Sequence, residues 1–81
     1  MSKKVINGSV FLDNMYLKQL PPGLLNDVYV FGDFDCHDNR LTSLEGAPRR
    51  VGGDFNCRSN PVKFTEEQVR AVCNVGRYVY V

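Results

Sequence analysis

The sequence predicts one small α/β domain built as a solenoid, with about four short parallel strands stacked on one another, one C-terminal helix and a closing strand. Three observations predict this fold. The chain has 81 residues, which is enough for a single domain. Four glycines recur at intervals of 21 to 24 residues, namely Gly8, Gly32, Gly53 and Gly76. A helix-start signal at Thr65 follows the third of them.

Composition and charge exclude several classes of protein. The sequence contains ten Lys and Arg residues and nine Asp and Glu residues. The resulting formal net charge of +1 is too small for a dedicated nucleic-acid binder. With 11% aromatic and 23% charged residues the chain is not a disordered tail. A chain of this length buries only roughly 60–65% of the surface that its unfolded form exposes, which leaves little room for a deep catalytic cleft. We therefore expect neither an enzyme nor a bound cofactor.

Targeting signals and cysteines indicate a cytoplasmic protein. The apolar run that a secretory signal peptide needs does not follow Lys3 and Lys4, and no segment approaches the roughly 20 apolar residues of a membrane span. Cys36, Cys57 and Cys73 are odd in number and far apart, unlike the disulfide framework of a small secreted domain. We expect reduced thiols and no contact with a membrane.

The segments that follow the four glycines share apolar registers. The second residue after each glycine is apolar or aromatic: Val10, Phe34, Phe55 and Tyr78. The fourth has the same character: Leu12, Cys36, Cys57 and Tyr80. Because side chains alternate along a strand, both registers are expected to face one core, with successive units about 4.8 Å apart. These registers define units of about residues 8–31, 32–52 and 53–75, closed by a capping strand over 76–81.

Two motifs carry a resemblance to a known family. They are Phe34-x-Cys36-x-x-Asn39-x-Leu41-x-x-Leu44 and Phe55-x-Cys57-x-x-Asn60-x-Val62. Each resembles the strand and asparagine turn of a leucine-rich repeat, whose period is 20–29 residues. The run 41–55 is similar to short repeats of tailed-phage proteins and bacterial effectors. The resemblance, over about residues 8–64, implies a minimal leucine-rich-repeat domain. Met15 stands where the other units have asparagine, so the first unit departs from the pattern.

The segments between the strands have their own signals. Pro21-Pro22-Gly23 and Gly46-Ala47-Pro48 read as extended return arms. Thr65 and Gln68 form a capping box, which predicts a helix over about 66–73 with Val69, Val72 and Cys73 facing the core and Phe64 as a hydrophobic staple. Gly76 ends this unit, and residues 77–81 read as the closing strand.

The N-terminal segment allows two interpretations. Val5-Ile6-Asn7-Gly8-Ser9-Val10 also matches a two-residue hairpin around Asn-Gly. In that case residues 3–6 add an antiparallel edge strand. Val10 and Leu12 face the core in either interpretation.

The residues that could carry chemistry do not form a catalytic or metal-binding pattern. Cys36 and His37 are neighbours on a strand and must point to opposite faces, so they cannot share a metal ion with Cys57. Asp35 and His37 lie on one face at two-residue spacing, as an acid–base pair or as an ordinary solvated face. No nucleophile or phosphate-binding motif accompanies them. We expect no catalytic residue and no metal.

The outward strand positions form the predicted partner-binding face. They are Ser9, Phe11, Asp13, Asp33, Asp35, His37, Asp54, Asn56 and Arg58. Four aspartates and one arginine give this face a charge of −3 on a protein of net charge +1. Such segregation favours a basic partner. The alternative is that Asp33 and Asp54 bond backbone N–H groups at the glycine turns.

These observations favour a non-enzymatic protein–protein interaction module, since repeat solenoids usually bind through an extended sheet face. The phage-like resemblance implies a small phage-encoded protein that inhibits or redirects a host protein, for example a defence protein, in the host cytoplasm. The alternative is a nucleic-acid-binding accessory protein that uses Arg49, Arg50, Lys63 and Arg70, with Tyr16 or Phe11 for stacking.

The closing strand predicts self-association. Its residues are Tyr78, Val79, Tyr80 and Val81, with both tyrosines expected at the inward register. No later repeat follows in this sequence to pair with its outer edge, and an unpaired apolar edge favours aggregation. We expect a symmetric homodimer or a target complex through residues 77–81, unless the edge is short enough to stay exposed.

Overall fold

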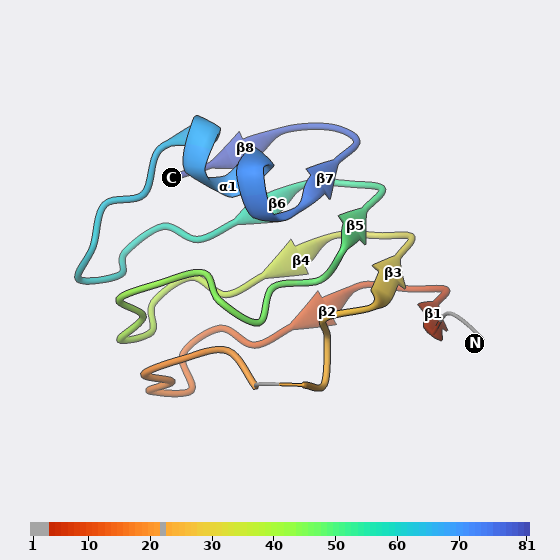
Figure 1. The fold of residues 1–81 in the computed structure, drawn as a ribbon. Helices are drawn as coiled ribbons and strands as arrows, with labels where there is room; N and C mark the ends of the chain where they lie inside the picture. Colours follow the sequence, from red (N-terminus) through yellow and green to blue (C-terminus); the bar gives the residue numbers. More distant parts are fainter. Residues whose placement is uncertain (1–3, 22) are drawn as a thin grey trace.

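The protein is a β-solenoid of two parallel sheets in a computed structural model that describes residues 4–21 and 23–81 (Figure 1). The first sheet contains β1 (Lys4–Ile6), β3 (Val28–Val30), β5 (Arg50–Val51) and β7 (Asn74–Val75) in that order. The second sheet contains β2 (Val10–Phe11), β4 (Phe34–Asp35), β6 (Phe55–Asn56) and β8 (Val79–Tyr80). The strands stack in chain order, so β1 and β2 lie at one end of the solenoid and β7 and β8 at the other.

The predicted stack of four short parallel strands is confirmed as the second sheet. Val10, Phe34, Phe55 and Val79 lie in one register across it. Phe34 and Phe55 are fully buried, with ring centroids 5.1 Å apart. The first sheet was not predicted, because strands of two or three residues carry too little alternation to be separated from a return arm.

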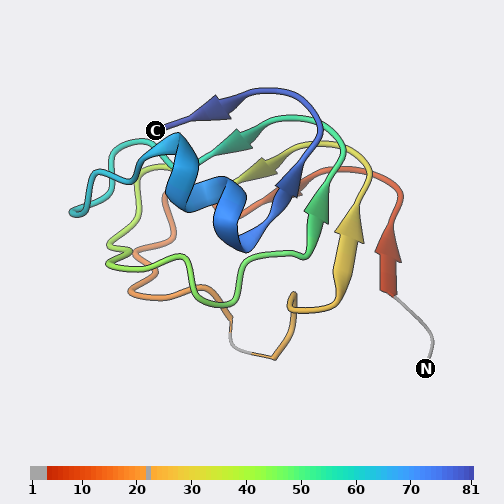
Figure 2. The ribbon, with the colours of Figure 1, turned by 45° about the horizontal axis from the view of Figure 1, so that its top comes forward.

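The two sheets meet along a corner where successive turns approach closely (Figure 2). Gly52 and Gly76 occupy this corner, and their N–H groups donate to Val30 O and Val51 O at 2.7 Å. A Cβ on Gly52 would lie 2.6 Å from Phe31 O, and one on Gly76 would lie 2.6 Å from Gly52 O. Glycine is therefore required here by the backbone of the preceding turn.

The register predicted for the closing strand is wrong by one residue. Val79, not Tyr78, lies beside Phe55 and packs against the core, while Tyr80 lies beside Asn56. The tyrosines therefore point outward, and Tyr78 is 63% exposed. The glycine alignment caused the error, because Gly76 is the structural equivalent of Gly52 rather than of Gly53.

The N-terminal hairpin is also wrong. β1 pairs in parallel with β3, and β2 pairs in parallel with β4, so the two strands belong to different sheets. Stacking on the next unit thus overrides the local turn preference of Asn7-Gly8. Val10 and Leu12 pack against the core as expected, although they are only partly buried. Lys3, the first residue of the edge strand in the hairpin interpretation, lies outside the described residues.

The C-terminal helix is confirmed as α1 (Glu66–Val72). Thr65 Oγ1 accepts from the Gln68 N–H at 3.1 Å, and Gln68 Oε1 accepts from the Thr65 N–H at 2.9 Å, which completes the capping box. Phe64, Val69 and Cys73 are buried. Val72 was expected in the core but is 48% exposed, because the chain becomes extended at Cys73 and turns that thiol inward instead. α1 contacts both β7 and β8.

The helix α1 is too short to cross a bilayer, and residues 4–21 and 23–81 contain no other helix that is long and apolar enough to do so.

Candidate protein-binding face

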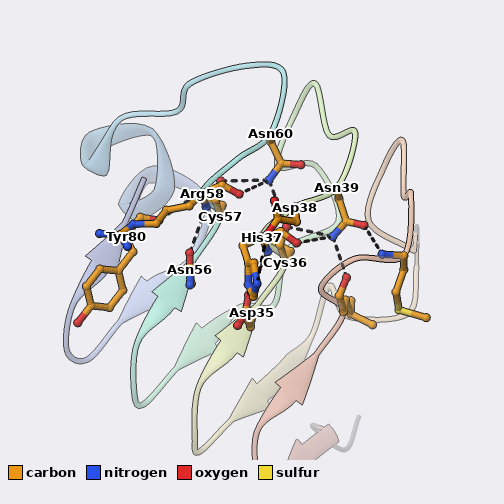
Figure 3. A network of polar contacts seen from close by, with 12 residues as sticks. Asp35, Cys36, His37, Asp38, Asn39, Asn56, Cys57, Arg58, Asn60 and Tyr80 are labelled. Atoms are coloured by element: carbon orange, nitrogen blue, oxygen red, sulfur yellow. Dashed lines mark hydrogen bonds and ion pairs between the residues drawn. The ribbon is translucent and has the colours of Figure 1, made fainter.

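The predicted partner-binding residues lie on the outer surface of the second sheet, which we call the outer face. Phe11, Asp35, Asn56 and Tyr80 lie side by side across its four strands. Figure 3 shows Asp35, Asn56 and Tyr80 on neighbouring strands. The structure therefore brings the predicted positions together on one surface and adds the two tyrosines of the last unit.

Side chains at the start of each strand link successive turns. Ser9 Oγ accepts from the Asp33 N–H at 2.9 Å, and Asp33 Oδ1 accepts from the Asp54 N–H at 2.8 Å. Asp54 Oδ1 then accepts from the Tyr78 N–H at 3.1 Å. The alternative considered for Asp33 and Asp54, bonding to the backbone, is thus confirmed. We call this series the aspartate ladder.

Asp35 and Asn56 hold the ends of their strands. Asp35 Oδ1 accepts from the His37 N–H at 3.0 Å, and Asn56 Oδ1 accepts from the Arg58 N–H at 3.1 Å. The His37 ring contacts Asp35 through Nδ1, and its Nε2 lies 3.5 Å from Asp38 Oδ2. The hydrogen bond to Asp35 raises the pKa of His37 above its usual value, against the effect of partial burial, and the charges of Asp35, Asp13 and Asp38 raise it further.

Asn39 and Asn60 form a second ladder at the bends beyond the strands (Figure 3). Asn39 Nδ2 donates to Leu12 O at 2.7 Å, and its Oδ1 accepts from the N–H groups of Met15 and Leu17, each at 3.0 Å. Each asparagine bonds its own turn and the preceding one, so its side chain satisfies backbone groups where the chain turns out of the strand. Because Asn39 satisfies the Met15 N–H, the first unit keeps its bend without an asparagine of its own.

The equivalent bonds of Asn60 show that the second ladder repeats. Its Nδ2 donates to Cys57 O at 3.0 Å within its own turn and to Cys36 O at 3.1 Å in the preceding one. Its Oδ1 accepts from the Leu41 N–H at 3.0 Å. The bends of the second and third units are therefore held in the same way.

The three cysteines are buried free thiols. Burial raises the pKa of Cys57 to about 11 and that of Cys73 to about 12, and it raises the pKa of Cys36 further. All three are therefore protonated at neutral pH and are poor nucleophiles and metal ligands. Within the described parts of the chain, no three His, Cys, Asp or Glu side chains are placed to hold a metal ion.

The residues of the nucleic-acid alternative are divided between two places. Arg49, Arg50 and Arg70 line an open depression of about 630 Å³ beside β5 and β7, where the other lining residues are uncharged. Arg70 is held there by Glu66 at 2.9 Å and by Val75 O at 2.8 Å. Lys63 lines a different depression.

The sequence interpretation missed the contribution of the closing strand to the outer face. The Arg58 guanidinium lies 5.1 Å from the ring centroid of Tyr80, a cation–π contact between neighbouring turns of the solenoid. The sequence of the closing strand did contain a signal for the outward position of its tyrosines. Val79 and Val81 are the fully apolar residues of the alternation, whereas a tyrosine has a hydroxyl that suits an exposed position.

Comparisons with protein-family models, with curated proteins and with solved structures find no match. The leucine-rich-repeat resemblance therefore stays a prediction, and function is inferred from the geometry described above.

Proposed function

We propose that the protein is a non-enzymatic protein-binding module and that its outer face contacts the target. The observation that supports this proposal most strongly is a group of aromatic and arginine side chains on the part of the outer face near β6 and β8. Arg58 lies over the ring of Tyr80, and Tyr78 is 63% exposed. Tyrosine and arginine are enriched among the residues that supply most of the free energy of protein–protein binding.

The ladders support this proposal because they make the face rigid. Asp33, Asp54, Asp35 and Asn56 each accept a hydrogen bond from the backbone. A preorganised face loses less conformational entropy on binding than a loop would. Since these carboxylates already have partners, we assign the target contact to the tyrosines, Arg58 and His37 rather than to the net negative charge.

The chemistry of the titratable groups fits binding better than catalysis. The thiols are buried and protonated, and His37, the only histidine in the sequence, is engaged by Asp35 and Asp38. We propose a protein target, which would be a host protein if the chain is phage-encoded.

The test compares two arginine–tyrosine cation–π pairs, one on the outer face and one away from it. Arg58 and Tyr80 lie on the outer face, whereas Arg40 lies 5.0 Å from the ring centroid of Tyr16, which is outside the predicted face. The full chain is used to capture a target from bacterial lysate, and affinity is then measured with the purified target. The double variant Arg58→Ala/Tyr80→Ser should bind at least about tenfold more weakly, whereas Arg40→Ala/Tyr16→Ser should bind like the wild type. Equal affinity of the two double variants would contradict the proposal.

A nucleic-acid function is supported by one observation, the convergence of Arg49, Arg50 and Arg70 on one depression. Binding of a labelled oligonucleotide would then fall steeply between about 50 and 200 mM salt. It would also be lost in Arg49→Ala/Arg50→Ala. Salt-independent binding of a protein target, unaffected by these two substitutions, would favour the protein-binding function instead.

A further inference from the structure

The free edge of β2 carries backbone groups that have no partner among residues 4–21 and 23–81. β2 is the outermost strand of the second sheet and pairs only with β4 there. The N–H groups of Val10 and Leu12 donate to Asp33 O and Asp35 O, each at 2.8 Å. Successive residues of a strand direct their backbone groups to opposite sides, so those of Ser9, Phe11 and Asp13 face away from β4.

The side chains along this edge are self-complementary. From Ser9 to Asp13 the order is polar, aliphatic, aromatic, aliphatic, polar, and it is the same in both directions. If an identical strand lies antiparallel to β2 with Phe11 at the centre, Phe11 faces its own equivalent and Ser9 faces Asp13. These are the residues whose backbone groups point outward, so they form hydrogen-bonded pairs. No like charges are brought opposite each other.

The same arrangement covers the end of the apolar core. Val10 and Leu12 are only partly buried, as are Ile6 and Leu17, because no turn lies below them among the described residues. At the other end of the solenoid Cys73 and Val75 are buried next to α1, while Val79 of β8 is partly buried like Val10. In the antiparallel pair, Val10 of one copy faces Leu12 of the other on the core side of the sheet.

We propose that the protein forms a symmetric dimer in which β2 pairs antiparallel with β2 of a second copy, with the two-fold axis at Phe11. The interface is isologous, as most homodimer interfaces are. It joins the two second sheets edge to edge and removes an exposed strand edge. This dimer uses the opposite end of the solenoid from residues 77–81, the edge expected from the sequence. It is a property of the chain alone and does not depend on the proposed target.

The test uses two matched substitutions in the full chain. Phe11 is 65% exposed and Tyr78 is 63% exposed, so replacing either ring with lysine leaves the core intact. Phe11→Lys places two lysines opposite each other in the dimer and should raise the dimer dissociation constant at least about tenfold. Tyr78→Lys should leave it unchanged. Mass in solution, measured by light scattering or sedimentation over a range of concentrations, gives the dissociation constants, and thermal unfolding checks that both variants fold.

Amide hydrogen exchange gives a second measurement that needs no variant. The Phe11 and Asp13 N–H groups should be protected only at concentrations where the dimer forms. The Val10 N–H, which donates to Asp33 O, should be protected in the monomer as well. A wild-type chain that is monomeric at high micromolar concentration would overturn the proposal. Dissociation by Tyr78→Lys but not by Phe11→Lys would also overturn it and assign self-association to the C-terminal edge.

Discussion

Asp33 Oδ1 accepts a hydrogen bond from the backbone N–H of Asp54, 21 residues later in the chain, at 2.8 Å. The two residues occupy the same position in successive turns, so the bond joins one turn of the solenoid to the next. Ser9 and Asp54 make the equivalent bond to the turn that follows each of them. The carboxylates that make this surface acidic therefore serve in large part to connect the turns.

Removing the carboxylate of Asp33 should destabilise the protein. Asp33→Ala leaves the Asp54 N–H without its acceptor and should lower the free energy of unfolding by about 0.5–1.5 kcal/mol. Asp33→Asn retains a carbonyl oxygen and should lose less. Urea denaturation measures both. Asp27→Ala is the control, because Asp27 lies on the surface at 3.9 Å from Arg49 and such exposed ion pairs contribute little to stability. Equal effects of the two alanine substitutions would show that the aspartate ladder does not contribute to stability.

Gly53 and Gly8 should respond differently to replacement by alanine. A Cβ on Gly53 would overlap the Asp33 carboxylate and lie 2.9 Å from Gly32 O, whereas a Cβ on Gly8 would have no atom within 4 Å. Gly53→Ala should therefore lower the free energy of unfolding by about 2 kcal/mol or more. Gly8→Ala should change it by no more than about 0.5 kcal/mol. The melting temperatures of the two variants test this, and a tolerated Gly53→Ala would contradict the close stacking of the turns.

The stacked phenylalanines should supply a large part of the stability. Phe55 is fully buried against Phe34, and Phe55→Ala should cost about 3–5 kcal/mol, which is comparable with the whole stability of a small domain. Phe31→Ala makes the same chemical change at a side chain that is 61% exposed and should have little effect. Circular dichroism and thermal unfolding measure both variants. A Phe55→Ala protein with an unchanged melting temperature would be incompatible with this core.

His37 should make the stability depend on pH. Its pKa is raised in the folded protein, so folding favours the protonated ring. This contribution is fully present below the unfolded-state pKa of about 6.5 and is lost as the pH rises through the folded-state pKa. An NMR titration of the ring should give a pKa above 6.5 in the wild type and a lower one in Asp35→Asn. The pKa should remain unchanged in Asp27→Asn, since Asp27 does not contact His37. A wild-type value at or below 6.5 would contradict the Asp35–His37 contact.

The local parts of this fold could be predicted from the sequence. The capping box at Thr65 and the alternation at Phe34 and Phe55 depend on neighbours within a few residues, and they identified α1, β4 and β6 correctly. The first sheet could not be predicted, since a strand such as Arg50–Val51 shows no period. The position of Tyr80 was missed because two adjacent glycines, Gly52 and Gly53, offered two alignments for Gly76.

The candidate site was predictable in its positions but not in its contacts. The outward register of Asp35, Asn56 and Arg58 follows from strand alternation. The bonds of Asp33 and Asp54 depend on residues more than 20 positions away, and the sequence left them as one of two alternatives. A further feature lies at the bends, where Asn14, Asp38 and Ser59 share a register and all have φ between 54° and 58°. The alignment alone does not show that these three residues adopt a left-handed conformation.

The ladders make the solenoid extensible by whole turns. Asp33 accepts from the following turn, and Asn39 bonds its own turn and the preceding one, so a turn carries all the groups that it needs to join its neighbours. A duplicate of residues 32–52 inserted after Gly52 would accept from the following turn through its own copy of Asp33, and the backbone N–H of that copy would donate to the original Asp33 instead of to Ser9. The chain would then grow by about 4.8 Å along the stack while both of its ends stayed as they are. Length in this protein is set by the number of turns and not by any single contact.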